Sequence, residues 1–289
     1  MSRRNIYSLS AAEWDRLVAA LNAMKASGAY DDFTRRHVAA MMISTRYPGE
    51  TGTTRNAAHR GPVFLPWHRQ ALREFELELQ TYDTGTPALE WPYWSWEGEG
   101  RTYPTGPGWW ASPIWSYVGG DGVSADGYRV ANGPFAGWTS VIYNSRTESF
   151  DPRPGIIRRF NRATNPMPTV SLKATRYDAS PWSENTDPSR SFRRRLEIAH
   201  NHVHNVVRGD MVSAASPNDP LFWLHHCNCD RIWARWQKLR GITNYQPDGG
   251  GPPGHNLHDV LQQMRATDST PATTLSRPAL GYTYDRLDG

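Results

Sequence analysis

Apolar side chains recur at helical spacing in five segments of the chain, which predicts a core built of helices. The first segment opens with Ser10-Ala-Ala-Glu13, a capping-box pattern, and Gly28 offers it a C-terminal stop. The second segment is expected to begin at Asp31 or Asp32, because aspartate is a favoured N-cap residue. These two segments predict a pair of consecutive helices near the N-terminus.

Three more helices are expected further along the chain. The third segment should begin near Pro66, because proline suits the first helical position. The fourth covers residues 190–208 and ends at Gly209, and the last opens with Asp219-Pro220, an N-cap followed by proline. The inward stripes of the five segments, in chain order, consist of Trp14, Leu17, Val18, Leu21 and Met24; Phe33, His37 and Met41; His68, Leu72, Phe75 and Leu79; Leu196, His200, Val203, His204 and Val207; and Phe222, His226, Cys229, Trp233 and Trp236.

The region between residues 97 and 188 follows a different pattern. It holds much of the glycine, proline and tryptophan, as in YPTGPGWWASPIWSYVGGDG, and it has no long periodic run. This composition is typical of irregular structure with a few short strands, which we expect to lie over the helices. The simplest interpretation is one domain over residues 1–289, mainly α-helical, with long irregular loops.

Composition and charge exclude several classes of protein. The chain has 289 residues, of which 21% are charged and 12% aromatic, a globular rather than a disordered composition. Its 32 basic residues are interleaved with 28 acidic ones, and the basic runs are short. We therefore expect a solvated surface and no nucleic-acid partner. No apolar run approaches the roughly 20 residues that span a bilayer, so no membrane association is expected either.

Targeting and cysteine content bear on the compartment. The N-terminal sequence MSRRNIYSLSAAEW has basic residues but no apolar h-region, so no signal peptide is visible. The only two cysteines, Cys227 and Cys229, lie two positions apart on a predicted helix and point to different sides, which disfavours a disulfide. A chain without a disulfide framework suits a reducing compartment. We therefore expect a cytoplasmic protein, or one exported with a partner.

Histidines are concentrated on the inward stripes. Three of them lie within HNHVH, where His200 and His204 share one face of the predicted helix and His202 points away. Such a pair alone is a weak signal for a metal. The stripes of the other segments, however, contain three more histidines, namely His37, His68 and His226. His59 lies nine residues before His68 and can join the set.

These inward histidines favour a metal site. A buried imidazole needs a partner, and few carboxylates lie on the same stripes. Neutral imidazole suits zinc, copper, iron and nickel. Six histidines divide naturally into two sites of three ligands, and two adjacent metals can clamp a small molecule. Neutral ligands stabilise Cu(I), the form that reduces dioxygen, so copper is favoured and a zinc hydrolase is the alternative.

Several longer segments around these histidines form a recognisable set. HRGPVFLPWHRQALREFE contains His59 and His68, and LEIAHNHVH and SPNDPLFWLHHCNCDRIW contain the later histidines. WPYWSWE, RYDASPW and GYTYD accompany them. With these motifs the chain resembles, nearly end to end, the bacterial tyrosinases and, more widely, the type 3 copper proteins.

The resemblance implies a mainly α fold in which a four-helix bundle encloses two copper ions, with dioxygen as the co-substrate. It implies that His37, His59 and His68 bind the first copper and that His200, His204 and His226 bind the second. His225 adjoins the last ligand but should point about 100° away on the helix. We therefore expect His225 to pack behind the site rather than to bind metal.

The resemblance also implies roles for residues around the metals. Glu197 and Asn201 match a glutamate and an asparagine thought to orient a water that takes the proton of a phenol, which is a reasonable arrangement for a general base. Asn205 is expected to contact the substrate ring or its substituent. Ser213 and Ala214 fall where relatives place a residue over the site entrance, and because both are small we expect an open mouth.

The function implied is the oxidation of phenols and o-diphenols to o-quinones with dioxygen. An o-aminophenol or catechol oxidase of secondary metabolism, with weak or no hydroxylation of monophenols, is the alternative, because HHCNCD and the short segment between Glu197 and His200 depart from the bacterial melanin enzymes. A dioxygen carrier is a third hypothesis, disfavoured because no lid domain is expected after Tyr284. The expected partners are a small phenolic or aminophenolic substrate and a small copper-delivery helper protein.

Overall fold

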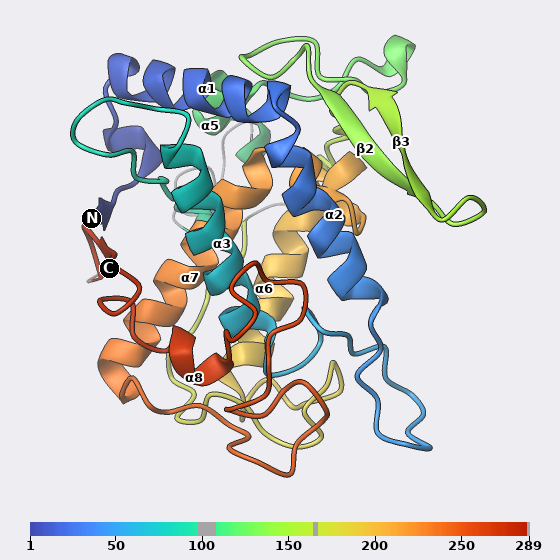
Figure 1. The fold of residues 1–289 in the computed structure, drawn as a ribbon, viewed down its shortest axis with the longest axis vertical. Coiled ribbons are helices and arrows are strands. Elements are labelled where there is room, and N and C mark those ends of the chain that lie inside the picture. Colours follow the sequence, from blue (N-terminus) through green and yellow to red (C-terminus); the bar gives the residue numbers. More distant parts are fainter. Residues whose placement is uncertain (98–107, 164–166, 288–289) are drawn as a thin grey trace.

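Four helices form the centre of the molecule (Figure 1). The computed structural model describes residues 1–97, 108–163 and 167–287. The four helices are α2 (Ala29–Met42), α3 (Phe64–Gln80), α6 (Phe192–Val207) and α7 (Leu221–Arg240). α3 packs against each of the other three, most extensively against α7, and α6 also packs against α7. The predicted mainly α fold with a four-helix core is confirmed.

The ends of the helices follow local signals in the sequence. At α1 (Ala11–Ala26) the predicted capping box is present, because the Ser10 side chain accepts from the backbone N–H of Glu13 and the Glu13 carboxylate accepts from that of Ser10. α7 begins at Leu221, so Pro220 rather than the predicted Asp219 takes the cap position. Asp219 Oδ1 still accepts from the backbone N–H of Leu221 at 2.9 Å and so satisfies a free N–H at the start of the helix.

Two predicted helix starts were wrong by a few residues. α2 begins at Ala29 rather than at Asp31 or Asp32, because Gly28 adopts a left-handed conformation (φ +83°) that turns the chain directly from α1 into α2. α3 begins at Phe64 rather than at Pro66, and the proline is accommodated within the first turn, where its missing N–H costs no hydrogen bond.

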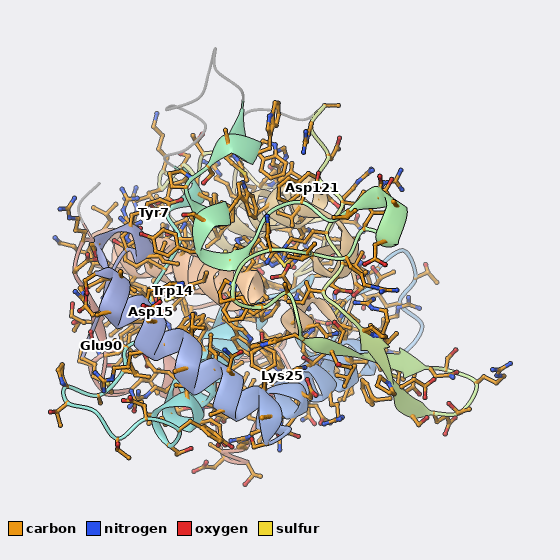
Figure 2. The ribbon with its side chains drawn as sticks, turned by 90° about the horizontal axis from the view of Figure 1, so that it is seen from above. Tyr7, Trp14, Asp15, Lys25, Glu90 and Asp121 are labelled. Atoms are coloured by element: carbon orange, nitrogen blue, oxygen red, sulfur yellow. The ribbon has the colours of Figure 1, made fainter. Side chains whose placement is uncertain are left out.

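α1 covers one end of the bundle, where it packs on α2 and α3. In the view from above, α1 carries Trp14 and Asp15 in its first half and Lys25 towards its far end (Figure 2). Trp14 is buried and makes an edge contact with Tyr117 at 5.6 Å between ring centroids, whereas Asp15 is exposed. This alternation is the amphipathic pattern that predicted the helix.

Irregular structure with short elements lies over the bundle, as expected for the region from residue 97 to 188. β2 (Thr139–Asn144) and β3 (Ser149–Pro154) form an antiparallel hairpin that projects beside α2. The short helix α5 (Ile114–Val118) precedes the hairpin, and α8 (Pro271–Thr274) packs on α3 near the end of the chain. Residues 98–107 and 164–166, which belong to the same predicted region, lie outside the described residues.

The two ends of the chain meet on one side of the bundle (Figure 1). β1 (Ser2–Arg3) pairs in parallel with β4 (Thr283–Tyr284). Beneath this pair lies a buried group of charged and phenolic side chains, which we call the terminal cluster. The terminal cluster consists of Arg3, Arg69, Glu76, Asp230, Tyr282 and Tyr284.

The two cysteines are buried and free, as expected. Burial raises the pKa of the Cys227 thiol to about 12, so at neutral pH it behaves as a small apolar side chain. Within the described residues, no helix combines the length and the apolar character that a bilayer crossing requires.

Candidate metal centre

A first cluster of three histidines joins two helices and a loop. His37 lies on α2, His59 on the loop between α2 and α3, and His68 on α3. One ring nitrogen of each lies within 4.8 Å of a ring nitrogen of the other two. All three are buried, and none is more than 9% exposed. The structure therefore brings together the three residues predicted for the first metal.

Backbone carbonyls fix how two of these rings are protonated. His37 Nδ1 lies 2.6 Å from the carbonyl oxygen of Ala214, and His68 Nδ1 lies 2.7 Å from that of Phe64. A carbonyl can only accept, so Nδ1 must carry the proton in both rings and Nε2 must present a lone pair. Neither Nε2 has a hydrogen-bond partner, although both are buried. A metal ion would satisfy both lone pairs.

The loop that carries His59 is held by a local turn. Asn56 Oδ1 accepts from the backbone N–H groups of Ala58 and His59, at 3.0 and 2.9 Å. This is the side-chain turn that asparagine favours. Two residues after His59 the chain runs against His255, and a Cβ on Gly61 would lie 2.6 Å from that imidazole. Glycine is therefore required at position 61 for the loop to approach this closely.

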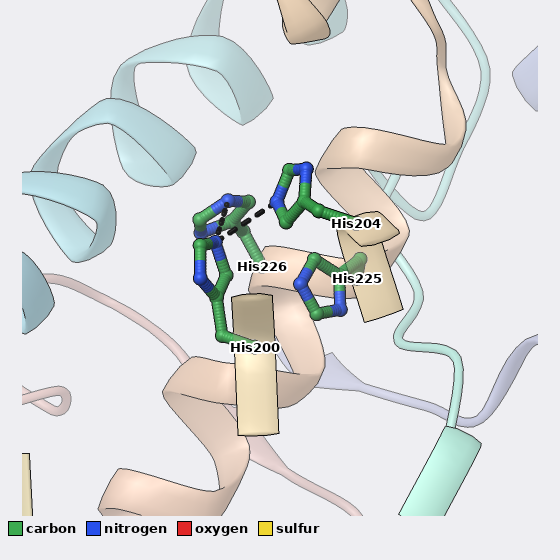
Figure 3. Close-up of side chains that lie close together, drawn as sticks. All are labelled: His200, His204, His225 and His226. Atoms are coloured by element: carbon green, nitrogen blue, oxygen red, sulfur yellow. Dashed lines mark hydrogen bonds between the residues drawn. The ribbon is translucent and has the colours of Figure 1, made fainter. Parts of the chain in front are cut away.

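The second cluster lies on α6 and α7 (Figure 3). His200 Nε2 lies 3.1 Å from His226 Nε2 and 2.9 Å from His204 Nε2. His200 Nδ1 donates to the side-chain oxygen of Asn201 at 2.9 Å, and His204 Nδ1 donates to the carbonyl oxygen of Met211. The Nε2 atoms of His200 and His204 therefore face each other as two lone pairs. Such an arrangement is unfavourable without a cation between them.

His225 lies closer to this cluster than its position on the helix predicted. It is fully buried, and its ring stacks on that of His200 with 4.9 Å between centroids and 18° between planes. A ring nitrogen of His225 falls within 4.8 Å of those of His200, His204 and His226. His225 and His226 leave α7 about 100° apart around the helix axis. Because α6 packs against α7, both rings nevertheless lie beside His200 and His204 (Figure 3).

The two clusters lie against each other. The rings of His68 and His226 stack with 4.1 Å between centroids and 11° between planes, and those of His59 and His200 lie 6.1 Å apart. Two metals held in these clusters would therefore be neighbours. This is the arrangement in which one small molecule can bridge both.

Burial keeps the histidines neutral. It lowers the pKa of His37 and of His204 to about 4, although a hydrogen bond to a backbone carbonyl opposes the shift in each case. Burial also holds the pKa of His59, His68 and His226 well below the usual value, and the neighbouring imidazoles lower it further. Neutral imidazoles at neutral pH need not lose a proton before they bind a metal.

A cavity of about 270 Å³ opens onto both clusters. The residues predicted for catalysis and for substrate binding all line it, together with four of the six predicted ligands. These lining residues are His37, His59, Glu197, His200, Asn201, His204, Asn205, Ser213 and Ala214. The other two predicted ligands, His68 and His226, belong to the clusters but are not among the lining residues.

The cavity also has lining residues that the sequence did not suggest. They include Met41, Arg60, Met211 and Val212. For Met41 a signal was present, since it follows His37 by one helical turn on the same stripe. Met211 reaches the site through its backbone carbonyl, which accepts from His204 Nδ1 and which no pattern of side chains predicts.

Comparison with known proteins decides the family. Residues 27–239 match the family model described as the common central domain of tyrosinase. The chain belongs to the tyrosinase family. It is 37% identical to a tyrosinase of Streptomyces antibioticus over 295 residues, which covers 98% of each chain. It is 35% identical to grixazone synthase of Streptomyces griseus over 323 residues, covering 98% of this chain and 99% of that one.

Solved structures agree on the fold of the tyrosinase family. A polyphenol oxidase variant of Thermothelomyces thermophila superposes with a TM-score of 0.67 at 22% identity, covering 99% of this chain and 89% of that one. Tyrosinases are dinuclear copper enzymes that use dioxygen, and the two histidine clusters fit two copper ions. The protein is therefore a copper oxidoreductase with tyrosinase-like activity on small phenols, as predicted.

Proposed function

We propose that the chain forms one catalytic domain over residues 1–289 and oxidises phenols and o-diphenols to o-quinones. In this proposal His37, His59 and His68 hold one copper, and His200, His204 and His226 hold the other. The observation that carries the assignment is the set of buried Nε2 lone pairs whose Nδ1 protons are already donated to oxygen atoms. When bound, the two coppers would bind dioxygen and pass to it electrons that come from the phenolic substrate.

The role proposed for Glu197 and Asn201 is to hold a water that takes the proton of a phenol. Glu197 lines the cavity and is 1% exposed, while Asn201 lines it from the exposed side of α6. Each oxygen of Glu197 accepts one hydrogen bond, Oε1 from the backbone N–H of Arg60 and Oε2 from Arg193, both at 2.6 Å. Each carboxylate oxygen has a second lone pair, so a water can still donate to Glu197 from the cavity.

The substrate would enter past Asn205, Ser213 and Ala214. All three line the cavity, and Asn205 and Ser213 are exposed. The small side chains at positions 213 and 214 support an open mouth. We propose that Asn205 contacts the ring substituent, so that it influences which phenol binds best.

A second candidate function is the oxidation of o-aminophenols or catechols with little hydroxylation of monophenols. It is supported by the relative named grixazone synthase, which is nearly as similar to this chain as the tyrosinases are. We rank it second because Glu197 is present in the cavity as a base for a phenol proton.

A small helper protein is proposed to deliver copper. The support is the burial of the donors, since five of the six proposed ligands are at most 9% exposed. Copper uptake by the apoprotein alone should then be slow, and a helper should accelerate it.

Oxygen uptake by the copper-loaded protein tests the proposed function. A monophenol, the matching catechol and the matching o-aminophenol are offered in parallel. Uptake with all three supports the tyrosinase assignment and the role of Glu197 and Asn201. Uptake with the catechol or the aminophenol alone supports the second candidate, and uptake with none of them contradicts both.

A further inference from the structure

Two buried charged side chains, Asp178 and Arg193, are linked by hydrogen bonds to Glu197. Arg193 Nε donates to Asp178 Oδ2 at 2.8 Å, and Arg193 Nη2 donates to Asp178 Oδ1 at 3.1 Å. The remaining arm, Nη1, donates to Glu197 Oε2 at 2.6 Å. Asp178 and Arg193 are fully buried, and Glu197 is 1% exposed. One guanidinium therefore joins two carboxylates, of which only Glu197 lines the cavity.

Asp178, the residue of this group farthest from the cavity, is fixed by further hydrogen bonds. Asp178 Oδ1 accepts from the Ser191 hydroxyl at 2.7 Å and from the backbone N–H of Ala179 at 2.8 Å. Arg193 Nη2 also donates to the carbonyl oxygen of Ser183 at 3.1 Å. Because the guanidinium is planar and two of its nitrogens are held by Asp178, its third nitrogen can point in only one direction, towards Glu197.

Glu197, which lines the cavity, is fixed by the loop of the first cluster. Glu197 Oε1 accepts from the backbone N–H of Arg60, which follows His59 and has a left-handed φ of +63°. Glu197 is thus held at both oxygens, by Arg193 on its own helix and by the backbone beside a proposed ligand. A carboxylate held at two points has one orientation towards the cavity.

We propose that Arg193 is a positioning residue, itself oriented by Asp178, which holds the Glu197 carboxylate aimed at the phenol proton. The proposal rests on the function proposed for Glu197. The step it serves is a proton transfer, in which the phenol O–H breaks, the proton passes through one water to the Glu197 carboxylate, and a phenolate remains. A catechol also loses protons when it is oxidised, but its oxidation adds no new oxygen to the ring. Catechol oxidation should therefore depend less on the orientation of Glu197.

A purely structural role for the buried pair is the competing explanation, and the chain offers a matched control. Arg158 Nε and Nη2 donate to Asp219 at 2.7 Å each, and both residues are fully buried. Neither residue lines the cavity. Arg158→Lys therefore weakens a buried bidentate pair of the same kind without touching Glu197.

The experiment compares Arg193→Lys with Arg158→Lys. Lysine keeps the charge but cannot hold both carboxylates in one plane. For each copper-loaded variant, kcat and KM are measured for a monophenol and its matching catechol, together with copper content and Tm. We expect Arg193→Lys to lower the monophenol kcat at least tenfold more than the catechol kcat, with KM for the catechol unchanged. Arg158→Lys should lower Tm and leave the ratio of the two kcat values as in the parent.

Two further variants complete the design. Asp178→Asn keeps Arg193 but removes the charge that orients it, so it should lower the ratio of monophenol kcat to catechol kcat by a smaller factor. If Arg193→Lys does not fold, Asp178→Asn provides the test of the proposal. An unchanged ratio in a variant that holds two coppers overturns the proposal. Glu197→Gln distinguishes the role of Glu197 from that of Arg193. An unchanged ratio of monophenol kcat to catechol kcat in this variant refutes the role of Glu197 itself. A lowered ratio in Glu197→Gln with an unchanged one in Arg193→Lys refutes only the role of Arg193.

Discussion

Two groups of buried polar side chains both include residues of α3 and α7 and differ in how their polar atoms are satisfied. On α3, His68 belongs to the first histidine cluster and Arg69 to the terminal cluster. On α7, His226 belongs to the second histidine cluster and Asp230, one turn later, to the terminal cluster. The two groups therefore share α3 and α7, although the histidine clusters also use α2 and α6 and the terminal cluster also uses β1 and β4.

In the terminal cluster, charges and hydroxyls find protein partners. Asp230 Oδ1 accepts from Arg69 Nε at 2.5 Å, and Asp230 Oδ2 accepts from the hydroxyls of Tyr282 and Tyr284 at 2.6 Å each. Arg3 donates to Glu76 at 3.0 Å. In the histidine clusters, by contrast, buried nitrogens remain without protein partners. A satisfied buried network holds elements together, whereas an unsatisfied one is prepared for a ligand.

The largest effect is expected where the unsatisfied group loses a donor. His226→Ala, or His68→Ala, should lose one copper and essentially all oxygen chemistry, because two of three donors cannot hold the ion in place. Copper content and oxygen uptake with a catechol measure this. Full oxidase activity in either variant would show that the ligand assignment is wrong.

A large effect of a different kind is expected in the terminal cluster. Asp230→Ala should lower the free energy of unfolding by about 3–5 kcal/mol, because it leaves the charge of Arg69 buried without its carboxylate partner. Urea denaturation measures this loss. Asp126→Ala, which breaks the exposed pair with Arg129, is the control and should cost less than about 1 kcal/mol. Suppose that Asp230→Ala folded and bound copper with unchanged stability but lost its activity. The claim that the terminal cluster stabilises the fold, while the histidine clusters carry the chemistry, would then be wrong.

In the copper-free protein, lowering the pH should remove the stabilising contributions of the two groups at different pH values. The pKa of His37 and His204 is about 4 in the folded protein and about 6.5 in an unfolded chain, so the unfolded chain binds more protons between those values. The copper-free protein should therefore lose stability as the pH falls from about 6.5 to 4. Its Tm, measured with and without copper across this range, gives the test. In the terminal cluster the pKa of Asp230 is lowered from 3.8, so its contribution is lost only in stronger acid. A flat Tm of the apoprotein down to pH 4 would contradict neutral buried histidines.

The smallest effect is expected at the rim of the cavity. Asn205→Ala should change the ranking of a phenol, a catechol and an o-aminophenol by roughly two- to tenfold in kcat/KM, as for the loss of one hydrogen bond of about 0.5–1.5 kcal/mol. Steady-state oxygen uptake with the three substrates measures it. Identical ratios in the variant and the parent would remove Asn205 from substrate recognition.

The comparison also explains what the sequence could predict. Helical periodicity placed His37, His68 and His226 on inward stripes, and their convergence follows from packing those stripes together. The carbonyls of Ala214 and Met211, which set the tautomers of His37 and His204, could not be predicted, because a backbone group has no signature in the sequence. Such contacts depend on how the loops cross the helices.

Tertiary contacts between distant residues were equally hidden. His225 was expected to point away from the second cluster, and only the approach of α6 brings its ring onto that of His200. Arg193 was one of a run of three arginines that suggested a solvated surface, yet it is fully buried between two carboxylates. Local patterns do not reveal which member of a charged run finds partners far along the chain.

The parallel pairing of β1 with β4 links the site to the order in which the chain is synthesised. Arg3 is made before any of the four helices that carry the histidines, but Tyr282 and Tyr284 are made only after all four of them. Until then Asp230 lacks both of its phenol partners. A nascent chain that stalls before residue 282 therefore holds the histidines without the brace that Tyr282 and Tyr284 supply. Stable copper binding should wait until these two residues have been made.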